Sequence, residues 1–149
     1  MDSSALQLIG RKVHGLTRQY EEEQNCKRKT AVTVAFRQLG LRVLEIGHWV
    51  NHPLHQDASR CTNETGGCGC VHSEPQAICS LLRGDFHRQP GDLILAVTYS
   101  PCTPCAHVIV ASRAIERVFW LEDTEHDLRG IDVLKSSLGR AEIIVPCSR

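Results

Sequence analysis

The sequence predicts an α/β protein in which a sheet packs against helices, and two observations support this prediction. Apolar residues make up 42% of the 149 residues, which is enough to build one buried core. The second half of the chain alternates strand-like and helix-like segments, which is typical of parallel strands joined by helical crossovers. We therefore expect a single domain spanning residues 1–149.

The first part of the chain is expected to contain a helix, a hairpin and a loop. Residues 3–24 predict an amphipathic helix, because their apolar side chains recur at steps of three or four. Residues 30–36 and 41–50 predict two strands separated by a glycine turn. Residues 51–71 hold Asn, His, Pro, Gly and Cys and predict a long loop, and such loops are usually functional or tied by metal.

The remaining segments alternate between helix and strand. A helix is expected to open at Ser73, because Gln76 stands three positions later and completes the pattern of a capping box. Residues 93–99 are apolar almost throughout, which favours a central strand. The predicted elements in chain order are a helix over 73–82, a strand over 93–99, a helix over 102–111, a strand over 117–121, a helix over 128–138 and a strand over 142–145.

Composition limits the possible classes of function. Lys+Arg and Asp+Glu balance at 17 each, so the chain lacks the cationic excess that a large nucleic-acid partner requires. The apolar stretches are too short to span a membrane, and no secretory signal is visible, so we expect a cytoplasmic protein. Eight cysteines in a reducing compartment indicate metal binding before disulfides.

Two short motifs carry the chemistry, His72-Ser73-Glu74 and Pro101-Cys102-Thr103-Pro104-Cys105. Each lies where a predicted strand gives way to a helix. Cys102 and Cys105 share one face of a helix start, where the positive end of the helix dipole favours thiolates. With His72 they supply three ligands for a Zn²⁺ ion and leave a fourth position open for water, as in catalytic zinc sites.

The two motifs together match the H-x-E…P-C-x-x-C signature of zinc deaminases. Because two thiolates offset the charge of the zinc ion, its water needs a neighbouring base. Our hypothesis is that Glu74 accepts the water proton, passes it to a ring nitrogen of the base and then protonates the departing amine.

Longer segments resemble the deoxycytidylate deaminase branch of the cytidine-deaminase-like superfamily, from about Asn25 to the end of the chain. The segments that carry the resemblance are Asn25–Lys29, Val50–Pro53, His72–Ile78, Ser100–Ala106 and Gly130–Leu134. The resemblance implies a three-layer α/β/α cytidine-deaminase-like fold with a mixed five-stranded sheet. It also implies conversion of dCMP to dUMP with release of ammonia by a homo-oligomer, from dimer to hexamer.

The sequence departs from the family pattern at two places near the expected substrate site. Gln76 stands where the family usually has Asn near the sugar, and Asn51-His52-Pro53 lacks the usual glycine. The residues that we expect to contact the substrate are Asn51 at the sugar or base, Arg28 at the 5′-phosphate, Tyr99 near the base, and Ser100.

A second, structural zinc site is a further hypothesis. Its expected ligands are Cys26, Cys61, Cys68 and Cys70, since four thiolates suit a closed tetrahedral site. His52 or His55 are alternative ligands there. The alternative interpretation is that these cysteines are ordinary loop and core thiols.

Three other interpretations stay open at this point. One is a different deaminase of the same fold, acting on modified dCMP, free cytidine or tRNA adenosine, although the neutral charge disfavours tRNA. Another is a catalytically silent zinc-binding module that assembles with partners, which has no need of Glu74. The third is a dithiol redox protein, which stoichiometric zinc would exclude.

Overall fold

The computed structural model describes residues 1–21, 30–53, 70–121, 128–138 and 140–144. Its helices and strands occur in the following order: α1 (Ser3–Tyr20), β1 (Val32–Leu39), β2 (Arg42–Val50), β3 (His52–Pro53), β4 (Cys70–Val71), α2 (Ser73–Arg83), the 3₁₀ turn η2 (Phe86–Arg88), β5 (Asp92–Val97), α3 (Thr103–Ser112), β6 (Arg117–Leu121), α4 (Leu128–Leu138) and β7 (Ala141–Ile144).

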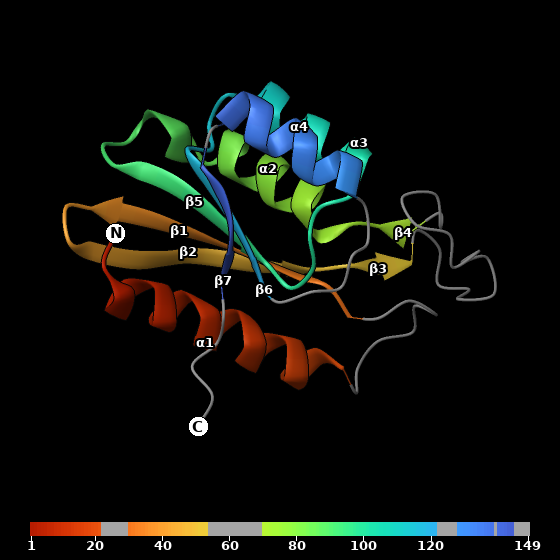
Figure 1. Cartoon of the computed structure of the whole chain (residues 1–149), viewed down its shortest axis with the longest axis horizontal. Helices are drawn as coiled ribbons and strands as arrows, with labels where there is room; N and C mark the ends of the chain where they lie inside the picture. The colour runs from red at the N-terminus through yellow and green to blue at the C-terminus, as the bar shows by residue number, and fades with distance from the viewer. Residues whose placement is uncertain (22–29, 54–69, 122–127, 139, 145–149) are drawn as a thin grey trace.

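Five of these strands form one mixed sheet in the order β2-β1-β5-β6-β7 (Figure 1). The β1–β2 and β1–β5 pairs are antiparallel, whereas β5–β6 and β6–β7 are parallel. The hairpin, the central place of β5 and the parallel second half all agree with the sequence predictions. Gly40 in the hairpin turn has a φ of 60°, a left-handed conformation that glycine adopts without steric cost.

Helices cover both faces of the sheet, which gives three layers. Helix α1 lies on one face, and α2, α3 and α4 lie on the other (Figure 1). Successive side chains of a strand point to opposite faces, so β5 contributes to two cores. Leu93, Leu95 and Val97 pack in the core beneath α2–α4, and Ile94 and Ala96 pack in the core beneath α1. This is the predicted cytidine-deaminase-like α/β/α architecture.

The structure differs from the sequence predictions mainly at the ends of elements and in the long loop. Helix α1 was predicted to reach residue 24, but in the described residues it ends at Tyr20. The predicted loop over residues 51–71 contains two short strands near its ends. These strands, β3 and β4, form an antiparallel pair in which His52 pairs with Val71 and Pro53 with Cys70. Strands of two residues carry no periodic signal, which is why the sequence pattern missed them.

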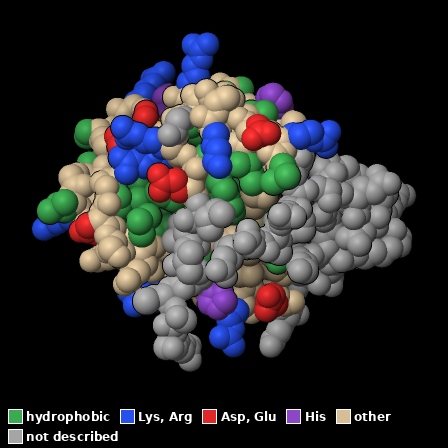
Figure 2. All heavy atoms as spheres, in the orientation of Figure 1, with side chains coloured by type: hydrophobic (Ala, Val, Ile, Leu, Met, Phe, Trp, Pro, Cys, Tyr) green, Lys and Arg blue, Asp and Glu red, His purple; other side chains and the backbone are tan. Residues whose placement is uncertain are grey.

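The surface agrees with the balanced composition. Figure 2 shows one face of the molecule, on which the described Lys and Arg side chains are interspersed with Asp and Glu. The described residues of this face therefore form no extended basic surface of the kind that nucleic acid requires. None of the helices in the described residues is long and apolar enough to cross a membrane.

Candidate metal centre and active site

His72 lies between β4 and α2, at the N-cap of the helix, with an extended backbone (φ −72°, ψ 151°). The Gln76 side chain fixes this junction, because its Nε2 donates to the carbonyl oxygens of Val50 (3.0 Å), His72 (3.2 Å) and Val71 (3.4 Å). Gln76 thus connects the end of β2 to the N-cap residue of α2. Gln76, which stands where the family usually has Asn, therefore has a structural role.

The predicted capping box is not formed. Ser73 is the first helical residue instead of the N-cap, and the side chain of the N-cap residue, His72, makes no capping hydrogen bond. The Ser73 hydroxyl lies 2.8 Å from the Thr33 hydroxyl on β1 and makes a longer bond of 3.4 Å to Glu74 Oε2. The capping pattern failed because a buried partner on another strand binds the hydroxyl that the local pattern assigns to the helix end.

Cys102 and Cys105 are placed by the start of α3. Cys102 is the N-cap, with φ −66° and ψ 162°, and Cys105 lies in the first turn. Pro104 fits the same turn, since the first amides of a helix need no intrahelical acceptor. Residues 98–102, which we call the cysteine loop, lead from β5 into this helix. Thr98 anchors the loop, because its amide donates to Val32 O at 3.0 Å.

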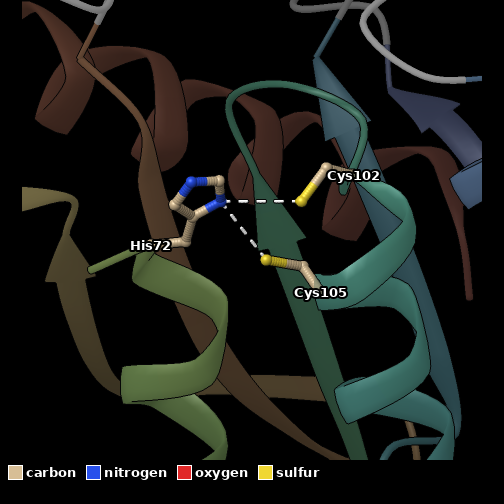
Figure 3. A group of neighbouring side chains, drawn as sticks. All are labelled: His72, Cys102 and Cys105. Atoms are coloured by element: carbon tan, nitrogen blue, oxygen red, sulfur yellow. Dashed lines mark hydrogen bonds between the residues drawn. The ribbon is translucent and has the colours of Figure 1, made fainter. Parts of the chain in front are cut away.

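The three predicted ligand side chains meet at one point although they come from two different helices (Figure 3). His72 Nδ1 lies 3.6 Å from Cys102 Sγ and 3.4 Å from Cys105 Sγ, and all three ligand atoms lie within 4.8 Å of one another. Tetrahedral zinc with bonds of about 2.3 Å to sulfur and 2.0 Å to nitrogen requires nitrogen and sulfur to be about 3.5 Å apart. The donor set and its spacing therefore fit a zinc ion.

The two thiols are coupled to each other. The pKa of Cys102 is lowered to about 4 because the Cys105 thiol donates a hydrogen bond to its sulfur, and the same bond raises the pKa of Cys105. Both side chains are buried. Zinc ligation requires both sulfurs as thiolates, so metal binding would release the proton of the Cys105 thiol.

Glu74 lies in the first turn of α2 and is only 7% exposed. Burial raises the pKa of its carboxyl above the ordinary value, and this effect outweighs the opposing influence of His72. A raised pKa makes a carboxyl a stronger base and keeps its protonated form accessible at a higher pH. The carboxyl interacts electrostatically with His72 and Cys102, so a buried carboxyl lies beside the three candidate metal ligands.

The predicted substrate residues are partly described. Asn51 is buried, and its Oδ1 accepts a bond of 2.7 Å from the Ala31 amide. Tyr99 is half-buried, and burial raises the pKa of its phenol. The Ser100 hydroxyl is buried and has no hydrogen-bond partner within the described part of the chain. Arg28 lies outside the described residues.

Most of the predicted second zinc site also lies outside the described residues. This holds for Cys26, Cys61 and Cys68, and for the alternative ligand His55. Cys70 is half-buried in β4, and His52 is exposed in β3. Among the described residues, His72, Cys102 and Cys105 form the one group that could hold a metal ion. The second site stays a prediction.

The sequence analysis did not identify Thr33, whose hydroxyl on β1 bonds to Ser73 at the start of α2. Its side chain is fully buried in β1, among apolar neighbours. A polar residue in a strand that is buried on both faces was the available signal, because such a group needs a hydrogen-bonding partner.

The three-layer fold and the His-Cys-Cys group at two helix starts define a zinc-binding α/β protein. The comparison with protein families identifies it further. Residues 18–122 match the model of the cytidine and deoxycytidylate deaminase zinc-binding region, and the chain belongs to this family of zinc deaminases. The match includes both motifs. No curated protein matches the chain.

Proposed function

We propose that this protein catalyses the hydrolytic deamination of a cytosine deoxynucleotide, converting dCMP to dUMP with release of ammonia. The observation that carries the proposal is the convergence of His72 Nδ1 and the two cysteine sulfurs beside the buried carboxyl of Glu74. A silent assembly module would have no use for this carboxyl, whose burial costs folding free energy. The choice of dCMP rests on the resemblance to the deoxycytidylate branch.

The residues divide into a metal-holding group and a proton-transfer group. His72, Cys102 and Cys105 would hold one Zn²⁺ ion, which supplies Lewis-acid activation of water. Glu74 takes the proton of the attacking water and delivers it to the ring nitrogen of cytosine. After the hydroxyl has added to the ring carbon, Glu74 takes its remaining proton and gives it to the amine, so that the carbonyl forms as the C–N bond breaks and ammonia leaves. Its raised pKa supports this cycle, because the same carboxyl must be a base and then an acid.

Four residues are proposed to bind the substrate. Ser100 is supported best, since a buried hydroxyl that has no hydrogen-bond partner among the described residues is suited to a hydrogen bond with a ligand. Tyr99 adjoins it in the cysteine loop. Asn51 is assigned from the resemblance. Arg28 is assigned to the 5′-phosphate because guanidinium offers two donors to phosphate oxygens.

The test is ammonia release from dCMP, 5-methyl-dCMP, dCTP, deoxycytidine and an adenosine-containing RNA hairpin. We expect turnover of dCMP and none of deoxycytidine, which lacks the phosphate. Turnover of another substrate would keep the zinc chemistry and overturn the choice of dCMP. A zinc-loaded protein that is silent on all five would favour the assembly module.

A matched pair of variants separates chemistry from folding. Glu74→Ala should retain zinc and lose at least about 100-fold in turnover, the lower end of general acid–base contributions. The exposed Glu116 offers the control, and Glu116→Ala should keep full activity. Full activity in Glu74→Ala would refute the role of this carboxyl.

We also propose that the enzyme is a cytoplasmic homo-oligomer with a second, structural zinc ion. Sedimentation of the zinc-loaded protein measures the number of subunits. Metal analysis decides the zinc count, with two ions per chain expected and one ion per chain contradicting the second site. The variant Cys70→Ser should then lower the count by one ion.

A further inference from the structure

Gly130, the third residue of α4, lies directly against the start of α3. A Cβ atom at this position would overlap the carbonyl oxygen of Pro101, and it would lie 3.0 Å from the carbonyl carbon of Cys102 and 3.1 Å from the amide nitrogen of Thr103. All three atoms belong to the backbone. No side chain could rotate away to make room, so the close approach requires glycine.

The backbone conformation of Gly130 does not itself require glycine. Its backbone is helical, and it is not among the described glycines with positive φ. Glycine in the body of a helix lowers helix stability relative to alanine. Gly15 in α1 provides a contrast, since a Cβ there would meet nothing within 4 Å.

The next turn of α4 also packs against α3. Leu134 follows Gly130 by four residues and therefore lies on the same side of the helix. Its side chain is fully buried in the core that includes Ala106 and Ile109 of α3. Figure 1 shows α4 running beside α3 over the same face of the sheet. Backbone contact at Gly130 and packing at Leu134 together hold α4 against α3.

We propose that Gly130 is a positioning residue for the metal centre, because it allows α4 to press on the backbone at Cys102. This inference rests on the proposed function, in which Cys102, Cys105 and His72 hold zinc. Cys102 is the last residue of the cysteine loop, which contains no helix or strand. The contact with α4 therefore restrains this ligand from a segment 28 residues later in the chain.

The test is the zinc affinity of the purified full chain, measured by competition with a chromophoric chelator well below the melting temperature. Gly130→Ala should weaken zinc binding about 10- to 100-fold, the range seen when groups that orient metal ligands are changed. Gly15→Ala should bind zinc like the parent. Circular dichroism at the same temperature establishes that each variant is folded.

The outcomes distinguish this proposal from the proposed function. A parent protein without zinc affinity would overturn both. A parent that binds zinc, together with a Gly130→Ala variant of equal affinity, would overturn the role of Gly130 alone. Equal weakening in the Gly15→Ala control would also overturn it, since the effect would then be general to helical glycines.

A second pair of variants covers the case in which Gly130→Ala does not fold. Leu134→Val and Ile9→Val each remove one methylene from a fully buried side chain, one in the core beneath α4 and the other beneath α1. Leu134→Val should weaken zinc binding by more than Ile9→Val at a comparable loss of melting temperature. Equal zinc affinity in the two variants would overturn the proposal.

Discussion

The buried hydrogen bond between Thr33 and Ser73 provides a test of how the sheet supports α2. The two hydroxyls lie 2.8 Å apart, and the side chains are 0% and 1% exposed. Removing either hydroxyl leaves the other in the core without this partner, which costs about 1–3 kcal/mol. Ser73→Ala and Thr33→Val should each lower the free energy of unfolding by this amount. The double variant leaves two apolar groups in contact and should lose little more than one single variant.

The assay is a double-mutant cycle of urea denaturation on the metal-free chain. A loss of about 2 kcal/mol corresponds to a fall in melting temperature of about 4–8 °C for a domain of this size. Ser136→Ala, at an exposed serine, should change stability by less than about 0.5 kcal/mol. The reasoning is refuted if the two single losses simply add in the double variant, because independent groups show no coupling.

The remaining predictions concern charge and metal. Glu74→Gln should stabilise the metal-free chain more at pH 8 than at pH 5. The pKa of Glu74 is raised in the folded state because burial disfavours the ionised carboxyl. The parent therefore loses folding free energy as the pH rises through this pKa, and the glutamine variant does not. Equal changes in melting temperature at the two pH values would contradict this. Arg37→Met should lose about 2–4 kcal/mol, because the buried guanidinium donates to three backbone carbonyls, whereas Arg88→Met at an exposed arginine should change stability by less than about 0.5 kcal/mol. Zinc at 1,000 times its Kd should stabilise the chain by about 4 kcal/mol, and thermal melts with and without chelator should show this shift in the parent but not in Cys102→Ser.

Local patterns predicted much of the fold. The bounds of β6 and α4 agree with the sequence prediction, because their apolar periodicities are strong and their ends are marked. The bounds of α1 and β1 agree less well, and β3 was predicted as part of a loop. Helix ends and two-residue strands depend on contacts outside the segment, and Ser73 is an example, since its hydroxyl binds Thr33 on β1 instead of capping α2.

The local sequence pattern was enough to predict which residues carry the chemistry. His72, Cys102, Cys105 and Glu74 stand out because metal ligands and a base at fixed spacings beside helix starts form a local pattern. How these groups are held depends on contacts between distant segments. Residues far apart in the chain meet in the strand order, in the hydrogen bonds of Gln76 and in the backbone contact between Gly130 and the cysteine loop. Such contacts arise when the layers pack together, and the periodicity of a single segment contains no information about them.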